Sequence, residues 1–307
     1  MKLANQTTEF ILIGLSCDPG LRIPLFLLFM TMYGTTLLSN GGLIALIQAD
    51  RRLWTPMYLL ICQLSLVDLC YSTTVTPKML VSFIVERNTI SYYGCMAQLY
   101  SYTTLGGAES FLLAAMGYDR YVAICLPLQY PSIMTRNACT RLVMGCHVGA
   151  FVNASVHLSL MLRLSFCGSI EIQHFFCDFP PLLHLSCTET HINRIVLFVL
   201  PCMMGMFSIL LIIISYASIF NTILSMRSNA GKLRAFSTCS SHFTAMTLFY
   251  GTAFFIYLRP SDSYFREQDM VVSVFYTVVI AMINPLIYSL RNQDIKKALK
   301  MALATKC

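Results

Sequence analysis

Charged residues are scarce in this chain of 307 residues: Lys, Arg, Asp and Glu make up 11% of it, whereas apolar residue types make up 56%. A soluble domain carries about 25% charged residues, so this composition leaves too little polar surface to keep a globule of this size in water. The same scarcity excludes disorder, which requires high charge. Long basic runs are also absent, which argues against nucleic-acid binding despite a net charge of +7. What remains is a membrane protein that crosses the bilayer several times.

Long apolar segments are abundant. A helix needs about 20 mostly apolar residues to cross the hydrocarbon core of a bilayer. Seven segments meet this requirement: 24–48, 56–80, 95–121, 139–163, 195–224, 235–258 and 270–290. All are too long and too evenly apolar for strands of a membrane barrel, so the sequence predicts an all-α membrane protein, a seven-transmembrane helix bundle. Six or eight spans are the alternatives, since His147, Asn153 and His157 interrupt the fourth segment.

Basic residues beside these segments predict their orientation. With seven spans, the side that holds the C-terminus carries 13 Lys and Arg against 3 acids, whereas the opposite side carries 8 against 9. Cytoplasmic loops are enriched in Lys and Arg, so we expect the C-terminus in the cytoplasm and the N-terminus outside. Residues 1–23 would form an extracellular tail, 24–290 the membrane domain with a long extracellular loop at 164–194, and 291–307 a cytoplasmic tail. The first segment lacks the basic start and cleavage site of a signal peptide, so we expect it to be retained.

Two features agree with this orientation. Asn5 begins an Asn-Gln-Thr acceptor in the expected extracellular tail and is a candidate glycosylation site. Cys95, Cys167, Cys177 and Cys187 fall on the same side, where the oxidising environment lets disulfides persist. The cysteines in or near the spans read as small buried apolar residues.

Two carboxylates lie inside the apolar segments. Asp68 is mid-way along the second segment, and Glu109 is mid-way along the third. Two close carboxylates at mid-bilayer cannot both ionise without a cation between them. The pair is therefore either a site for a monovalent cation such as sodium or a protonated, hydrogen-bonded contact between helices. Asn40 and Asn284 occur at a similar depth and could complete a polar cluster.

Adjacent charges end the third segment on the cytoplasmic side. Asp119 and Arg120, followed by Tyr121, could pair locally, while Arg120 could also swing to another partner, as a switch requires. The alternative is an arginine that only snorkels to the interface. In the seventh segment, Pro285 removes a backbone donor next to Asn284 and loosens the helix.

A short basic segment follows the last span. Ile295, Leu299 and Leu303 recur every four residues with three lysines beside them. This pattern predicts a short amphipathic C-terminal helix that lies along the membrane lipid of the inner leaflet.

Several motifs follow one another along the chain: Leu53-Trp54-Thr55-Pro56-Met57-Tyr58, Leu64-Ser65-Leu66-Val67-Asp68, Met116-Gly117-Tyr118-Asp119-Arg120-Tyr121-Val122-Ala123-Ile124-Cys125, Ser215-Tyr216, Arg234-Ala235-Phe236-Ser237-Thr238-Cys239-Ser240-Ser241-His242 and Pro285-Leu286-Ile287-Tyr288-Ser289-Leu290-Arg291-Asn292. In identity, order and spacing they resemble the motifs of the olfactory receptor family, which belongs to the rhodopsin-like G-protein-coupled receptors. The sequence departs from the usual family pattern at several positions: Trp54 stands where His is usual, Gly117 where Ala is usual, and Leu126 where Asn or His is usual.

The resemblance implies several structural roles. It implies the disulfides Cys95–Cys177 and Cys167–Cys187, and it implies that Asp68 faces Glu109. It places a ligand site between the third, fifth, sixth and seventh spans, with the residues Tyr102, Thr103, Gly106, Gly107, Ser110, Phe179, Met204, Gly205, Tyr250, Ala253, Phe254, Tyr257, Val274 and Thr277. It assigns activation and G-protein coupling to Asp119, Arg120, Tyr121, Tyr216, His242, Asn284, Pro285 and Tyr288.

The implied ligand set is uncharged. It suits a small, mostly apolar odorant with one hydrogen-bonding group, and it disfavours a biogenic amine, which would need a buried carboxylate. The resemblance therefore implies an odorant receptor of sensory cilia that activates a stimulatory, olfactory-type G protein and raises cAMP. No enzymatic activity and no organic cofactor are expected. Cys239 and His242 lie three residues apart on one helical face, but two ligands are too few to fix a copper ion.

Three other classes of protein remain as alternatives: a chemosensory receptor for another small metabolite, a transporter or channel, and an intramembrane enzyme. The sequence contains neither the inverted repeat of many transporters nor polar rings that would line a pore. For an enzyme, Asp68 and Glu109 would be the candidate catalytic pair.

Overall fold

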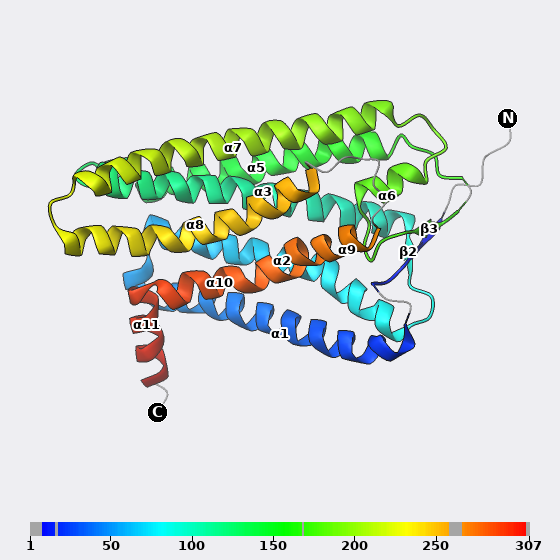
Figure 1. The fold of residues 1–307 in the computed structure, drawn as a ribbon, viewed down its shortest axis with the longest axis horizontal. Coiled ribbons are helices and arrows are strands. Elements are labelled where there is room, and N and C mark those ends of the chain that lie inside the picture. The colour runs from blue at the N-terminus through cyan, green and yellow to red at the C-terminus, as the bar shows by residue number, and fades with distance from the viewer. Residues whose placement is uncertain (1–7, 16–17, 168, 258–265, 305–307) are drawn as a thin grey trace.

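The computed structural model describes residues 8–15, 18–167, 169–257 and 266–304. Long helices lie side by side along the molecule (Figure 1). In chain order they are α1 (Pro19–Ala49), α2 (Pro56–Ile84), α3 (Tyr92–Cys125), α5 (Arg136–Met161), α7 (His191–Ser225), α8 (Asn229–Tyr257) and a run formed by α9 (Arg266–Val274), η2 (Phe275–Val279) and α10 (Ile280–Arg291). One helical turn, η1 (Arg51–Leu53), connects α1 to α2, and another, α4 (Tyr130–Ile133), connects α3 to α5.

Five helical segments in the described part of the chain are long and apolar enough to cross a membrane: Pro19–Ala49, Pro56–Ile84, Arg136–Met161, His191–Ser225 and Met270–Ser289. The sequence predicted seven. Helices α3 and α8 have spanning lengths of 34 and 29 residues but are more polar than the five. The polarity of α3 follows from its position, because it packs against α2, α5, α7 and α8. Helices in a membrane carry their polar residues on surfaces that face other helices.

Helix α7, in contrast to α3, exposes many apolar side chains. Its side chains Phe198, Phe207 and Phe220 are each more than half exposed. So much exposed aromatic surface on one helix suits the hydrocarbon of a bilayer and not water.

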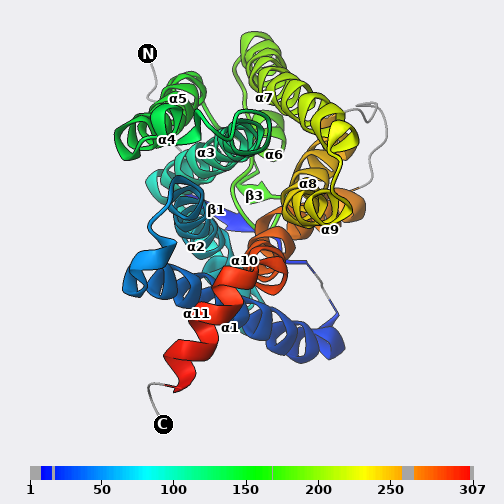
Figure 2. The same cartoon turned by 90° about the vertical axis from the view of Figure 1, so that its left-hand side faces the viewer.

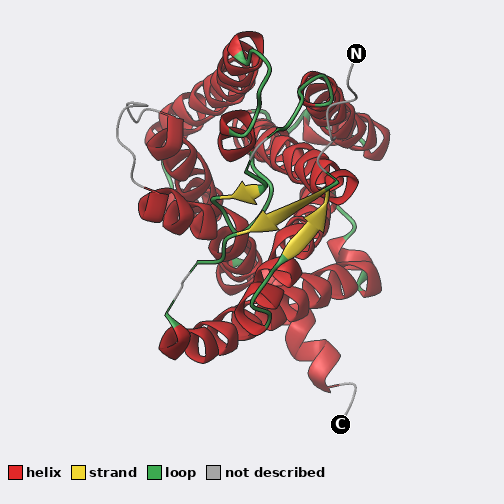
Figure 3. Cartoon of the chain, turned by 90° about the vertical axis from the view of Figure 1, so that its right-hand side faces the viewer, coloured by secondary structure: helices red, strands yellow, loops and turns green. Residues whose placement is uncertain are grey.

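A small sheet closes one end of the bundle (Figure 3). Its central strand is β1 (Glu9–Leu12), which pairs antiparallel with β2 (Thr89–Ser91) and parallel with β3 (Glu171–Ile172). Phe10 on β1 is fully buried, and its ring meets Phe166 edge to face at 5.4 Å. Part of the segment expected as a plain tail is therefore folded into a cap over the helix ends.

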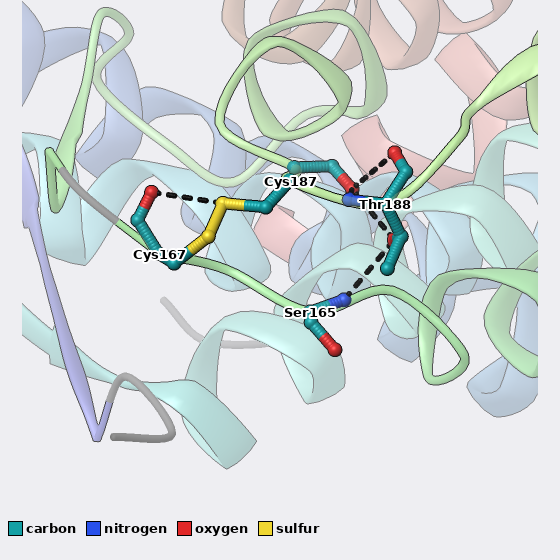
Figure 4. The surroundings of a disulfide bond; sticks show 5 residues. Ser165, Cys167, Cys187 and Thr188 are labelled. Atoms are coloured by element: carbon teal, nitrogen blue, oxygen red, sulfur yellow. Dashed lines mark hydrogen bonds between the residues drawn. A yellow bond between two sulfur atoms is a disulfide. The ribbon is translucent and has the colours of Figure 1, made fainter. Parts of the chain in front are cut away.

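Two disulfides hold the loop between α5 and α7, as the family resemblance implied. Cys95 at the start of α3 is bonded to Cys177, and Cys167 is bonded to Cys187. Around the second disulfide, the backbone N–H of Ser165 donates to the Thr188 hydroxyl (Figure 4). The loop also contains the short helix α6 (Phe179–His184). Both predicted pairings are confirmed.

A final helix, α11 (Gln293–Ala304), turns away from the bundle axis at the end opposite the sheet (Figures 1 and 2). Ile295 and Ala298 are buried, at 1% and 4% exposure, where α11 meets α1 and α10. Tyr58 on α2 donates to Asn292 at 3.1 Å, which fixes the start of the helix. The predicted C-terminal helix is present, with its lysines exposed.

Candidate functional site

Tyr102 on α3 is the centre of an aromatic group near the sheet end of the bundle. Its ring lies 5.3 Å from Phe176, 5.8 Å from Tyr71 and 6.3 Å from Tyr276. Phe176 adjoins Cys177, so the disulfide to α3 holds the loop ring against Tyr102. Aromatic pairs at these separations contribute about 0.5–1.5 kcal/mol beyond the area they bury.

Ser110, two helical turns further along α3, connects three helices. Its hydroxyl lies 3.0 Å from the hydroxyl of Tyr250 on α8 and 3.5 Å from that of Ser208 on α7. All three side chains are at most 9% exposed. A buried hydroxyl without a partner is costly, so this network stabilises the contact between α3 and α8 only while it stays complete.

Other members of the predicted ligand set differ in how closely their surroundings are packed. Gly107 lies against α5, where a Cβ would approach Ala150 to 3.2 Å and the Met204 methyl to 3.8 Å. A Cβ on Gly205 would meet nothing within 4 Å. Thr277 is fully buried, and its hydroxyl donates to the Ser273 carbonyl at 2.6 Å.

Six other residues belong to the predicted set. On α3, the Thr103 hydroxyl donates to the Leu99 carbonyl, and a Cβ on Gly106 would meet the Tyr71 ring at 3.6 Å. Val274 packs against the apolar cluster that contains Phe176. The side chains of Ala253, Phe254 and Tyr257 lie outside the described part of the structure.

Phe179 lies apart from the other predicted ligand residues. It is 7% exposed and packs against His157 on α5, with the ring centroids 5.3 Å apart. The two line a cavity of about 10 Å³ with Leu160, Met161, Leu183, Asn193 and Leu197, between α5, α6 and α7. Ligand pockets typically measure 300–1,000 Å³, so this cavity cannot hold an odorant as it stands.

The two intramembrane carboxylates meet at one amide. Asn284 on α10 donates from Nδ2 to Asp68 Oδ2 at 3.1 Å and to Glu109 Oε1 at 3.2 Å. Asp68 and Glu109 are 1% and 2% exposed. The Asn40 amide donates to the Ala281 carbonyl at 2.9 Å and so ties α1 to α10 beside this group.

Oxygen atoms suitable for a hard cation occur in this part of the bundle. Besides the carboxylates of Asp68 and Glu109, two buried amide oxygens, Asn40 Oδ1 and Asn284 Oδ1, have no hydrogen-bond partner among the described residues. Carboxylate and amide oxygens are ligands that hard cations prefer. The residues present therefore fit a sodium ion, provided that Asn284 turns its oxygen toward the ion.

The charged pair near the end of α3 that adjoins α4 is only loosely joined. Arg120 Nη2 lies 3.8 Å from Asp119 Oδ2, whereas the hydroxyl of Tyr130 on α4 donates to Asp119 Oδ1 at 2.8 Å. Asp119 is 1% exposed, and the Arg120 side chain is 12% exposed. Tyr121 is partly buried, with its ring 6.3 Å from that of Tyr118. Since Tyr130 supplies the short contact to Asp119, Arg120 is free to take another partner.

His242 on α8 forms hydrogen bonds to both α3 and α7. Its Nε2 lies 3.0 Å from the Leu113 carbonyl on α3, so this nitrogen carries the proton and donates it. Its Nδ1 accepts from the hydroxyl of Tyr216 on α7 at 2.8 Å. Both ring nitrogens are occupied, so a copper ion shared with Cys239 would have to displace the tyrosine hydroxyl. Tyr288 and Pro285 on α10 are also buried.

Comparison with known proteins decides the family. The sequence model described as olfactory receptor matches residues 29–306. The chain belongs to the olfactory receptor family. Olfactory receptor-like protein COR4 of Gallus gallus is 52% identical over 298 residues, which are 97% of this chain and 96% of that protein. Olfactory receptor 5AP2 of Mus musculus is 52% identical over 302 residues, covering 98% and 95%. Olfactory receptor 5B12 of Homo sapiens is 50% identical over 300 residues, covering 98% and 96%.

Membership confirms the resemblance drawn from the sequence motifs. Together with the apolar helices it makes this olfactory receptor a multi-pass protein of the plasma membrane. The family is not one of enzymes, which removes the basis for treating Asp68 and Glu109 as a catalytic pair.

Sequence reasoning missed a contact between the disulfide-bonded loop and α9. His174 Nε2 lies 3.2 Å from the Ser273 hydroxyl, and the imidazole stacks on Phe175 with centroids 4.7 Å apart. Burial lowers the pKa of His174 to about 3, so the ring is neutral at physiological pH. The olfactory receptor thus uses a neutral histidine to attach its loop to the last helical run.

Tyr130 was also missed. Its burial and its bond to Asp119 raise the pKa of its phenol, which therefore stays protonated and donates. Neither His174 nor Tyr130 carries a sequence signal of its own, because each acts through a partner on another element.

Proposed function

We propose that this olfactory receptor binds a small, mostly apolar odorant between α3, α7, α8 and the α9–α10 run, and activates a stimulatory, olfactory-type G protein that raises cAMP. The observation that carries the proposal is the bond between Ser110 and Tyr250 at 3.0 Å. It lies among the predicted ligand residues and at the same time joins α3 to α8, so a ligand that competes for it acts directly on the contact between these helices.

Ligand chemistry follows from the described side chains. Tyr102, Phe176 and Tyr276 supply apolar aromatic surface, and Ser110 and Tyr250 supply hydroxyls. A volatile of about ten heavy atoms, at roughly −0.5 kcal/mol each, would bind with about −5 kcal/mol, a Kd of order 0.1–1 mM. Affinity this low makes the response depend on how strongly the ligand prefers the active arrangement over the resting one.

Signal transfer runs inward along α8. When a ligand group takes the place of the Tyr250 hydroxyl at Ser110, α8 loses one of its attachments to α3. The next attachment is the bond of His242 to the Leu113 carbonyl, and Tyr216 shares the same imidazole. Movement of α8 away from α3 would break this contact and open the region around Arg120 to the G protein.

Orientation and ion binding complete the proposal. The excess of Lys and Arg on one side supports a C-terminus in the cytoplasm and an N-terminus, with the acceptor Asn5, outside; Asn5 lies outside the described residues. Seven spans, with α3 and α8 added to the five apolar segments, give this arrangement.

A sodium ion between Asp68 and Glu109 would stabilise the resting state of the bundle. Sensory cilia are the expected location from the family.

The test is a screen of an odorant panel in cells that co-express the receptor and a stimulatory, olfactory-type G protein, with cAMP as the readout. We expect at least one odorant to raise cAMP, and Tyr250→Ala to abolish the response at equal surface expression. Tyr100→Phe is the matched control, because its hydroxyl also bonds another helix, at Ser155 on α5 (3.3 Å), but lies outside the α3–α8 contact. A full response from Tyr250→Ala would refute the proposed path. An odorant-driven current without cAMP would support a channel.

A further inference from the structure

Two arginines and a tryptophan meet where η1 adjoins the start of α5. Figure 2 faces the end of the bundle that carries α4 and α11. The Cζ of Arg51 in η1 lies 5.8 Å from the centroid of the Trp54 ring, and the Cζ of Arg136 at the start of α5 lies 5.9 Å from it. Trp54 is 56% exposed, and both arginines are exposed. The fold thus places two like charges, far apart in the sequence, on one accessible indole.

Neither positive charge is neutralised. Within the described ranges, neither guanidinium forms an ion pair, because the neighbouring acid, Asp50, is bound to Arg52. An exposed cation over an indole gains about 0.5–1 kcal/mol, which does not remove the repulsion between the two arginines. A bound anion would remove it and would add charge-assisted hydrogen bonds.

The ring itself is held in place. The indole Nε1 of Trp54 donates to the Ile47 carbonyl at the end of α1, at 3.2 Å. A fixed ring keeps both guanidinium groups close to the indole, where they are exposed and can bind phosphate bidentately. Two arginines beside one indole ring suit a headgroup with more than one phosphate.

A lipid is the source of phosphate that the surroundings favour. On α5, Met144 and Phe151 follow Arg136 on the same side of the helix and are 57% and 55% exposed. Acyl chains of a lipid whose headgroup lies at Trp54 would run along this apolar face. Basic pockets between helices on the cytoplasmic side bind phosphoinositide headgroups in other membrane proteins.

We propose that Trp54, Arg51 and Arg136 form a binding site for the headgroup of a polyphosphoinositide of the inner leaflet. The proposal rests on the orientation given above, because these lipids belong to the cytoplasmic leaflet. It extends the function beyond odorant binding, since lipid composition would then influence the receptor through the α1–α2 turn and the start of α5.

The test uses the full-length receptor in nanodiscs of neutral phosphatidylcholine, titrated with a fluorescent phosphatidylinositol bisphosphate. We expect saturable binding that weakens at least tenfold in the double variant Arg51→Gln/Arg136→Gln and several-fold in Trp54→Ala. The matched control is Lys297→Gln/Lys300→Gln, which removes two exposed charges from α11 and leaves the indole and both arginines unchanged; we expect less than a threefold change.

Several outcomes would overturn the proposal. Equal weakening in both double variants would mean that only overall charge attracts the lipid. Phosphatidylserine, or free inositol trisphosphate, binding as tightly as the bisphosphate lipid would also contradict it. If the glutamine variant fails to fold, Arg51→Lys/Arg136→Lys keeps the charge but loses the bidentate geometry and should still weaken binding at least threefold. No odorant or G protein is present in this assay, so its failure and the failure of odorant signalling are separate results.

Discussion

Asn284 links two deeply buried carboxyl groups of the receptor. Its single amide donates to both Asp68 and Glu109, while its own oxygen has no partner among the described residues. If both carboxylates ionise, one neutral amide cannot balance two negative charges in a medium of low dielectric constant. Either one of the two carboxyl groups is protonated, or a bound cation balances their charge.

The sodium proposal predicts a salt-specific stability. An ion present at ten times its Kd stabilises the folded state by about 1.4 kcal/mol, which corresponds to a few degrees in Tm. We expect the Tm of the purified receptor to be higher in sodium chloride than in choline chloride at equal ionic strength, and Glu109→Gln to lose this difference.

Glu189→Gln, an exposed acid in the loop between α6 and α7, is the control and should keep the full sodium effect. Equal Tm values for the native receptor in the two salts would favour the protonated alternative.

His174 predicts a dependence of stability on pH. Its pKa is about 3 in the folded receptor, against an ordinary value of 6.5, so the unfolded chain takes up the proton first as the pH falls. This contribution to stability is complete above pH 6.5 and is lost between pH 6.5 and about 3, by at most about 1.4 kcal/mol per pH unit.

Thermal unfolding of the purified receptor at pH 7.5 and 5.5 measures the effect. We expect His174→Gln, which can still bond Ser273, to reduce the fall in Tm, whereas His184→Gln on the exposed face of α6 should not. The same fall in all three proteins would show that other groups cause it.

Gly117 offers a prediction about a whole helix. It lies within α3, where glycine costs about 1 kcal/mol relative to alanine. A Cβ there would meet His242 at 3.5 Å and Ile212 at 3.6 Å, which are ordinary contacts. We therefore expect Gly117→Ala to raise the Tm by roughly 1–3 °C.

Gly107→Ala is the contrasting variant on the same helix. Its Cβ would come within 3.2 Å of Ala150 Cβ, so α3 and α5 would have to separate slightly. We expect no gain or a loss of Tm. A gain of the same size at both positions would mean that helix propensity alone decides the outcome.

Removal of the two disulfides should reduce the stability of the folded receptor by different amounts. In the chain-entropy account, closure of 82 residues between Cys95 and Cys177 stabilises by about 4.5 kcal/mol, and closure of 20 residues between Cys167 and Cys187 by about 3.3 kcal/mol. We expect Cys95→Ser/Cys177→Ser to reduce surface expression more than Cys167→Ser/Cys187→Ser. The reverse order would contradict this account.

Elements with strong local patterns were predictable from the sequence. Apolar runs gave the positions of the helices, and the family motifs gave both disulfide pairings. The sheet was not predictable, because β1 pairs with strands about 80 and 160 residues away and each strand has only two to four residues. Non-local pairing of such short segments leaves no periodic signal.

Site geometry was predictable only in part. The similar depth of Asp68, Glu109 and Asn284 in apolar segments suggested a polar cluster, and the family resemblance implied that Asp68 faces Glu109. Phe179 could not be placed, since the loop that carries it is oriented by disulfides and by packing on His157. The partnership of His174 with Ser273 joins residues 99 apart and depends on the same loop.

At the scale of the whole molecule, the account depends on an odd number of membrane crossings. The sheet lies at one end of the bundle, and α11 lies at the other (Figure 1). The disulfides hold the loop that contributes β3 to the sheet. This polarity matches an oxidising exterior for the disulfides and an anionic inner leaflet for the basic residues. Odorant binding, G-protein coupling and the lipid site at Trp54 all require it.

Antibody access to epitope tags at the two ends of the chain, in intact and permeabilised cells, measures this polarity directly. We predict that an N-terminal tag is stained on intact cells and that a C-terminal tag is stained only after permeabilisation. Staining of both tags on intact cells, or of neither before permeabilisation, would contradict the account.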